Sequence, residues 1–281
     1  MSDGLQARAA PAAIRLVVSD IDGTLVIPDK QVTPRAMAAV KALAAAGVGF
    51  SVVSARPPRG MAAIVSRLGV RQPYAAFNGG ALMGGDGRLI AAERLTAEAA
   101  RTILGRLAER KVDAWVFADD SWRLTHSDGP QVGRERAAVG FDPVVVAHFE
   151  DVIDRIDKIV GVSDDAAQLL DLEAGAADWL EGAALVQRSQ AYYLDFTALR
   201  ADKGHAVRAI CEHAGVPLEE TAVIGDMSND VAMFEVAGLS IAMGQAPDAV
   251  KARADAVTDA NSAEGFAHAV ERLVLPQVRR P

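Results

Sequence analysis

The chain has 281 residues, of which 51% are hydrophobic and 23% are charged, and its formal net charge is −8. This composition is typical of a soluble globular protein, and the length suits two domains better than one. The acidic balance argues against a nucleic-acid-binding protein, which needs a basic surface. No apolar run approaches the roughly 20 residues of a membrane span, so we expect no membrane association.

Residues 1–13 lack the continuous apolar stretch of a signal peptide and are predicted to form a flexible tail. The single cysteine, Cys211, cannot form an internal disulfide and lies within a helical pattern. We therefore expect a buried thiol and a cytoplasmic location. A monomer and a homodimer are both compatible with the sequence.

The first part of the chain alternates between predicted strands and helices. Short β-branched apolar runs predict buried strands, and longer segments with apolar residues at helical spacing predict helices. In chain order these are a strand at 16–20, a helix at 32–46, a strand at 48–53, a helix at 60–68 and a strand at 74–77. Such alternation is the signature of a parallel, doubly wound sheet.

The pattern changes after residue 80, where predicted strands follow one another directly. We expect a hairpin of strands at 81–83 and 88–91, a helix at 96–110, strands at 112–117, 122–125, 144–146 and 158–162, a helix at 164–180, and strands at 184–188 and 192–196. Adjacent strands mixed with helices indicate a separate α+β unit over roughly 82–190.

Strand–helix alternation resumes near Lys203. The predicted elements are a helix at 204–214, a strand at 222–225, a helix at 228–235, a strand at 239–243, a helix at 247–252, a strand at 255–258 and a helix at 263–274. We therefore predict an α/β protein with a doubly wound, Rossmann-like core made of residues 14–81 and 191–281. An α+β cap domain at 82–190 is inserted into it.

Two aspartates mark the end of the first predicted strand. Asp20 closes the strand, and Asp22 follows two residues later, before Gly23 and Thr24. This spacing places both carboxylates at one edge of the sheet, where open α/β folds bind ligands. Two acids so close together favour a bound cation or a shared proton. A lone Asp-Gly pair would more simply be a turn after a strand.

Three further motifs lie at strand ends or helix starts: Ser54-Ala55-Arg56, Asp202-Lys203-Gly204, and Gly225-Asp226-Met227-Ser228-Asn229-Asp230. Taken singly, each suits an ordinary turn, a solvated lysine or a helix N-cap. Together, in this order around a cap-sized insertion, the four motifs resemble those of the haloacid dehalogenase superfamily, specifically its Cof-type phosphatases. The resemblance covers residues 14–275.

The resemblance implies a Mg²⁺-dependent phosphatase that hydrolyses a small phosphorylated metabolite, such as a sugar phosphate or a cofactor phosphate. Asp20 is then the nucleophile that forms an aspartyl-phosphate, and Asp22 is the general acid and base. Mg²⁺ is expected between Asp20, the backbone carbonyl of Asp22 and the side chain of Asp226. Asp230 is expected to orient the metal ligands from outside the coordination sphere.

The remaining residues of the motifs are expected to hold the substrate. Ser54 and Lys203 are implied to bind the phosphoryl group, and Gly23 and Thr24 lie in the turn that wraps it. Asn229 is expected to orient Lys203 and is a further candidate for substrate binding.

Two residues near the end of the predicted strands have open alternatives. Asn78, in an Asn-Gly pair, is either a turn residue or a substrate contact. Arg56 either holds substrate or pairs with a carboxylate. Two other functions also stay open, a phosphosugar mutase of the same superfamily and a catalytically inactive phosphate-sensing protein.

Overall fold

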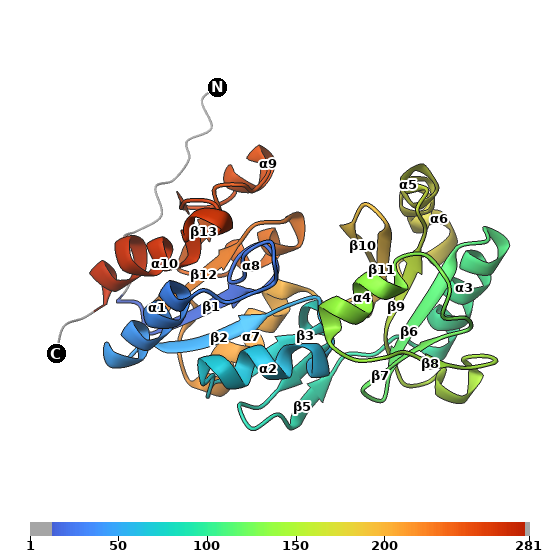
Figure 1. Cartoon of the computed structure of the whole chain (residues 1–281), viewed down its shortest axis with the longest axis horizontal. Coiled ribbons are helices and arrows are strands. Elements are labelled where there is room, and N and C mark those ends of the chain that lie inside the picture. Colours follow the sequence, from blue (N-terminus) through green and yellow to red (C-terminus); the bar gives the residue numbers. More distant parts are fainter. Residues whose placement is uncertain (1–12, 279–281) are drawn as a thin grey trace. The chain divides into compact units, whose positions relative to one another are not determined.

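The computed structural model of the chain describes residues 13–278 (Figure 1). It comprises two compact units: unit 1 contains the residues up to Ser51 and from Val207 onward, and unit 2 contains Val52–Ala206. The predicted tail at 1–13 lies, apart from Ala13, outside the described residues. The core and cap boundaries near residues 81 and 190 stay a prediction.

Unit 1 is built on a parallel sheet with the strand order β14-β13-β12-β1, followed by β2. The strands are β1 Leu16–Asp20, β2 Gly49–Val53, β12 Thr221–Gly225, β13 Leu239–Ala242 and β14 Ala256–Val257. Every residue of β1, β12 and β13 is buried. Their largely apolar sequences reflect burial on both faces of the sheet, which confirms the predicted parallel α/β architecture.

The helices around this sheet are α1 Pro34–Ala45, the part of α7 Lys203–Ala214 from Val207, α8 Val231–Phe234, α9 Asp248–Lys251 and α10 Gly265–Ala269. The Thr33 side chain accepts a hydrogen bond from the Ala36 amide and caps α1. Helix α1 packs against α10 (Figure 1). The predicted helix at 228–235 is shorter, because residues Ser228–Asp230 form a 3₁₀ turn before α8 begins.

Unit 2 begins with the end of β2, which pairs in parallel with β3 through Val53 and Ala75. Its first elements are α2 Pro58–Leu68, β3 Tyr74–Ala76, β4 Ala81–Met83 and β5 Leu89–Ala92. Strands β3, β4 and β5 pair antiparallel, which confirms the predicted hairpin. Strand β5 is the last in the strand order, and its side chains are exposed.

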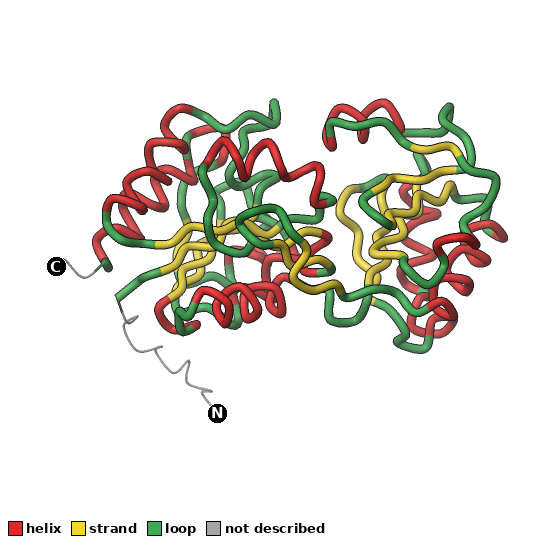
Figure 2. Tube along the Cα trace, turned by 90° about the horizontal axis from the view of Figure 1, so that it is seen from below, coloured by secondary structure: helices red, strands yellow, loops and turns green. Residues whose placement is uncertain are grey.

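The second part of unit 2 is a six-stranded sheet with the order β10-β11-β9-β6-β7-β8. The strands are β6 Asp113–Ala118, β7 Ser121–Leu124, β8 Val144–Val145, β9 Ile156–Val162, β10 Leu185–Gln190 and β11 Tyr193–Thr197. The helices are α3 Ala97–Glu109, α4 Val132–Val139, α5 Ala166–Ala174 and α6 Ala176–Leu180. Figure 2 shows the strands with the helices gathered mainly on one side.

The core of this part lies between the sheet and helices α3, α5 and α6. Ile103 and Leu107 of α3 and Leu169 of α5 pack with Val116 of β6 and Phe196 of β11. Alternate residues of these strands therefore point to the helices, and those between them form a second face of the sheet.

Two predictions for this region were wrong in detail. The predicted helix at 164–180 is divided into α5 and α6 at Gly175. Helix α4, Val132–Val139, was not predicted at all.

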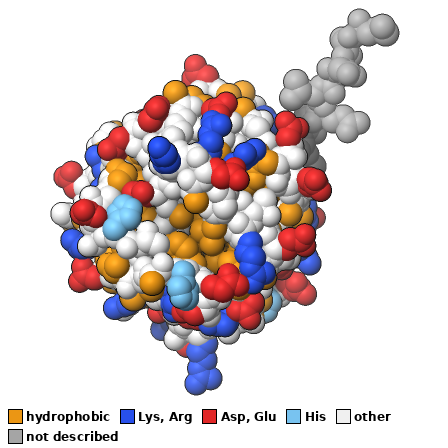
Figure 3. Space-filling view, turned by 90° about the vertical axis from the view of Figure 1, so that its right-hand side faces the viewer, with side chains coloured by type: hydrophobic (Ala, Val, Ile, Leu, Met, Phe, Trp, Pro, Cys, Tyr) orange, Lys and Arg blue, Asp and Glu red, His pale blue; other side chains and the backbone are white. Residues whose placement is uncertain are grey.

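No helix within residues 13–278 is long and apolar enough to cross a membrane. On the face shown in Figure 3, acidic and basic side chains are interspersed around a central group of hydrophobic ones.

Candidate active site

The sheet of unit 1 brings two of the predicted aspartates to one edge. Asp20 is the last residue of β1, and Asp226 directly follows β12. Strands β1 and β12 are parallel neighbours, with Ser19 opposite Ile224. Because their carboxyl ends meet at the same edge, the two side chains emerge side by side. The continuous apolar sequence of each strand is what positions the carboxylates, since it fixes both strands inside the sheet.

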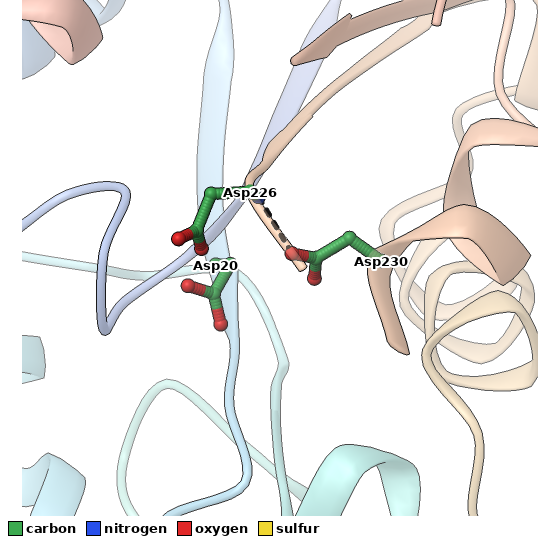
Figure 4. A group of neighbouring side chains, drawn as sticks. All are labelled: Asp20, Asp226 and Asp230. Carbon is green, nitrogen blue, oxygen red and sulfur yellow. Dashed lines mark hydrogen bonds between the residues drawn. The ribbon is translucent and has the colours of Figure 1, made fainter. Parts of the chain in front are cut away.

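Asp20, Asp226 and Asp230 form a group in which one carboxylate oxygen of each residue lies within 4.8 Å of those of the other two. Figure 4 shows the carboxylates of Asp20 and Asp226 next to each other, with Asp230 approaching from the start of the following helix. The three residues are buried, at 4%, 7% and 0% exposure. Like charges at this separation repel strongly when removed from water. A divalent cation that prefers oxygen ligands, such as Mg²⁺, fits this donor set and would offset the repulsion.

Asp230 is fixed by the backbone of the same motif. Its Oδ2 accepts hydrogen bonds from the Asp226 amide at 2.7 Å and from the Met227 amide at 2.9 Å. A side chain at Gly225 would place its Cβ 2.4 Å from Cγ of Asp230. The glycine therefore leaves the space that this carboxylate occupies. Asp230 in turn holds the backbone from which the Asp226 side chain projects.

The turn after Asp20 packs closely on Asp226. Gly23 has φ +88°, a conformation that side chains other than hydrogen disfavour, and an added Cβ would lie 2.3 Å from Oδ2 of Asp226. The Thr24 hydroxyl donates a hydrogen bond to Oδ1 of Asp226 at 3.2 Å. Gly23 and Thr24 thus orient a carboxylate of the group. Their predicted contacts with phosphate stay predictions.

Gln245 is a residue of this site that was not predicted. Its Nε2 donates to the Gly23 carbonyl at 2.6 Å and to Oδ2 of Asp226 at 3.3 Å. Its Oε1 accepts from the Asn261 amide at 3.0 Å. The side chain therefore connects the turn after β1, the Asp226 carboxylate and a third loop. The feature of the sequence that could have pointed to Gln245 is its position three residues after β13, the parallel neighbour of β12.

The Asp22 side chain is not one of the three carboxylates of this group. Its Oδ1 accepts a hydrogen bond from Nζ of Lys30 at 2.7 Å, and the two side chains are 31% and 49% exposed, respectively. The metal contact expected of Asp22 involves its backbone carbonyl and stays a prediction. Asn229 is half-buried in the 3₁₀ turn that precedes α8.

The other predicted site residues lie in unit 2, where the structure brings them near one another. The buried Asn78 has left-handed backbone angles, and its amide donates to the Ser54 carbonyl at 2.8 Å. The Ser54 hydroxyl accepts from the Arg56 amide at 3.2 Å. A Cβ on Gly79 would lie 2.7 Å from the Asp202 carbonyl, so this turn abuts the segment that leads to the buried Lys203.

Comparisons with known proteins agree with this geometry. A family model for haloacid dehalogenase-like hydrolases matches residues 17–270. Phosphatase YwpJ of Bacillus subtilis is 27% identical over 290 residues, covering 93% of this chain and 100% of the relative. HMP-PP phosphatase of Cronobacter sakazakii is 27% identical over 232 residues, covering 83% of this chain and 85% of the relative.

Solved structures give the same result. The crystal structure of a haloacid dehalogenase-like hydrolase from Bacteroides thetaiotaomicron has a TM-score of 0.83 and 26% sequence identity, and covers 92% of this chain and 99% of its own. The family match spans the strands and loops that carry Asp20, Asp226 and Asp230. The resemblance seen in the motifs is thus confirmed, and the chain belongs to the haloacid dehalogenase-like hydrolase family.

Proposed function

We propose that the protein is a phosphatase that hydrolyses a small phosphate monoester through an aspartyl-phosphate on Asp20. The observation that carries this proposal is the buried group of Asp20, Asp226 and Asp230 at adjacent parallel strand ends in a hydrolase of this family. The names of relatives support it. They include HMP-PP phosphatase and phosphoglycolate phosphatase, the latter from Methanopyrus kandleri and 26% identical over 263 residues.

In the first step a carboxylate oxygen of Asp20 attacks the phosphorus atom, and the bond from phosphorus to the ester oxygen breaks. Asp22 donates its proton to the leaving alkoxide, which departs as an alcohol. In the second step water attacks the phosphorus, Asp22 accepts a proton from it, and the bond to Asp20 breaks. Inorganic phosphate is released, and both carboxyl groups return to their starting states.

Asp20 and Asp226, with the backbone carbonyl of Asp22, would hold Mg²⁺. When bound, the ion would neutralise carboxylates that otherwise repel the anionic substrate and would polarise a phosphate oxygen. Asp230, Thr24 and Gln245 hold these ligands in place through the hydrogen bonds described above. Removal of any of them is expected to weaken metal binding without removing a metal ligand.

The phosphoryl group is proposed to be held by Ser54 and Lys203, on the strength of the motifs that they share with the family. The Lys203 ammonium supplies positive charge where negative charge grows in the transition state. Burial makes this charge more effective, since the surrounding dielectric is low. Asn78, Arg56 and Asn229 are further proposed contacts of the substrate.

The test is phosphate release from a panel of phosphorylated metabolites in the presence of Mg²⁺, with the wild type and Asp20→Asn. The wild type should release phosphate and lose this activity in excess EDTA, and addition of Mg²⁺ should restore it. Asp20→Asn should be inactive while its thermal unfolding stays similar, because asparagine keeps the shape of aspartate.

Substantial turnover by a folded Asp20→Asn would exclude the covalent mechanism. Transfer of phosphate between substrate hydroxyls without release would instead indicate a mutase. Binding of phosphate esters with no reaction at all would indicate a phosphate-sensing protein.

A cytoplasmic location also stays a proposal, which the buried Cys211 thiol suits.

A further inference from the structure

A buried ion pair lies at the centre of the six-stranded sheet of unit 2. Nζ of Lys158 on β9 donates to Oδ2 of Asp195 on β11 at 2.7 Å, and the two side chains are 8% and 3% exposed. Neither residue belongs to a motif of the proposed reaction. Two opposite charges in the middle of a sheet therefore call for an explanation.

The pair belongs to the face of the sheet that points away from the helical core. In the strand register, Asp195 lies opposite Val160, which lies opposite Trp115 of β6. Lys158 lies between Phe117 and Thr197 in the same way. The alternate residues, such as Ile159 and Phe196, pack on the helices. This second face, which we call the polar–aromatic face, carries Lys158, Asp195, Trp115, Phe117, Tyr193 and Thr197.

Stability alone does not account for the pair. Removing two charges from water costs about as much as their attraction returns, so buried ion pairs often stabilise a fold no more than apolar residues would. In addition, Oδ1 of Asp195 is buried and accepts no hydrogen bond from any residue of the described range. A buried carboxylate oxygen without a donor is costly. A ligand that donates a hydrogen bond to it would remove that cost.

Aromatic side chains flank the pair. The rings of Trp115 and Tyr193 lie 5.3 Å apart, and those of Trp115 and Trp122 lie 4.9 Å apart. The buried Nε1 of Trp122 also lacks an acceptor within residues 13–278. Aromatic side chains beside polar atoms whose hydrogen bonds are unsatisfied are typical of a small-molecule site.

The polar–aromatic face is connected, within unit 2, to the residues proposed to bind phosphate. The Phe77 ring packs on Phe117 at 5.7 Å, and Phe117 is the strand partner of Lys158. Phe77 immediately precedes Asn78, whose amide contacts Ser54. The residues proposed to bind phosphate are thus linked to the ion pair through packed side chains of unit 2.

We propose that Lys158 and Asp195 bind hydroxyl groups of the substrate's leaving group, and that the substrate is the phosphate monoester of a neutral polyhydroxy compound. The proposal rests on the phosphatase function proposed above. A hydroxyl group both donates and accepts, so it matches a carboxylate oxygen beside an ammonium group, which has three donors. The pair is neutral overall, and Oδ1 of Asp195 would repel an anionic leaving group.

The experiment compares two esters that differ only in hydroxyl groups, a hexitol phosphate and n-hexyl phosphate. The wild type should have the higher kcat/KM for the hexitol phosphate. Asp195→Asn should lower kcat/KM for the hexitol phosphate about ten- to hundredfold more than for n-hexyl phosphate, since a charge-assisted hydrogen bond is lost. The loss should lie mainly in KM if the contact is equally strong in the ground state and the transition state.

Asp157→Asn is the matched control. Asp157 is a buried aspartate on β9, next to Lys158, and its Oδ1 accepts from Nε of Arg94 at 3.0 Å. This variant should leave the ratio between the two esters unchanged. The double variant Lys158→Met with Asp195→Leu replaces the pair with apolar groups that keep the fold, and it should lose the preference for the hexitol ester as Asp195→Asn does.

The outcomes separate the two proposals. Hydrolysis of both esters with an unchanged ratio in Asp195→Asn overturns the role of the pair, and so does a wild type that prefers n-hexyl phosphate. Either result leaves the phosphatase function intact. Failure of the wild type to hydrolyse any phosphate ester overturns the proposed function and, with it, this inference.

Discussion

Replacement of Gly23 by alanine should damage the proposed metal site more than it damages the fold. The added Cβ would lie 2.3 Å from Oδ2 of Asp226, whereas ordinary van der Waals contact with a Cβ begins at 3.4 Å. The Asp226 carboxylate would have to retreat by about 1 Å. Mg²⁺ requires near-ideal geometry with bonds of roughly 2.0–2.1 Å. A shift of this size would therefore prevent Asp226 from serving as the proposed Mg²⁺ ligand.

The expected effect of Gly23→Ala has two separable parts, a loss of stability and a loss of Mg²⁺ affinity. The first is backbone strain, because φ is +88° at Gly23, and a non-glycine residue in this region costs about 1–2 kcal/mol. The second is the displaced carboxylate. Changes in residues that merely support a metal ligand lower metal affinity about ten- to hundredfold, so displacement of the ligand itself should cost at least that much.

The variant Gly47→Ala isolates the effect of backbone strain. Gly47 has φ +74°, but no atom lies within 4 Å of a Cβ added there. Both variants should therefore lose a few degrees of thermal stability, whereas only Gly23→Ala should lose Mg²⁺ affinity. Isothermal titration with Mg²⁺ and thermal unfolding in EDTA measure the two effects separately. Equal Mg²⁺ affinity in Gly23→Ala and Gly47→Ala would refute the placement of Asp226 as a metal ligand beside this turn.

Two other predictions concern single side chains. Gln245→Ala removes the donors to the Gly23 carbonyl and Asp226, so Mg²⁺ affinity should fall about ten- to hundredfold, and unchanged affinity would show that the amide is dispensable. Burial raises the pKa of the Cys211 thiol, so the thiol should stay protonated at neutral pH and react with Ellman's reagent after denaturation, whereas rapid reaction of the native protein would contradict its burial.

Most of the fold could be predicted from local patterns, and the failures have local causes. Strands β1, β12 and β13 were predictable because burial on both faces requires continuous apolar runs. Helix α4 was not, since Val132 and Val139 alone are buried along it. Its first flanking residue, Gln131, has φ 62° and provides no side-chain cap. The helix at 164–180 was predicted as continuous because the apolar spacing continues across Gly175, where the structure divides it.

Some residues of the candidate site could likewise be predicted from the sequence, and others could not. Asp20 could be identified because it ends a short apolar strand. Asp226 was assigned through the resemblance of the four motifs to the family, since its own motif also suits a helix N-cap. The position of Gln245 after β13 could have marked it as a candidate, but its contact with the turn after β1 depends on tertiary structure. The Lys158–Asp195 pair is equally hidden, because it follows from the register between β9 and β11. Residues that act through tertiary contacts are therefore the ones that sequence patterns miss.

The hydrogen bonds around Asp226 also bear on how the site works. Thr24 donates to Oδ1, Gln245 donates to Oδ2, and Asp230 holds the backbone amide of Asp226 itself. These contacts come from three different segments, so together they define both the position of the residue and the rotation of its carboxylate. A carboxylate held in this way needs little reorganisation to bind a cation. On the proposal that Asp226 is a ligand of Mg²⁺, the energetic cost of gathering three carboxylates is met during folding, and the free energy of cation binding goes to affinity instead of rearrangement.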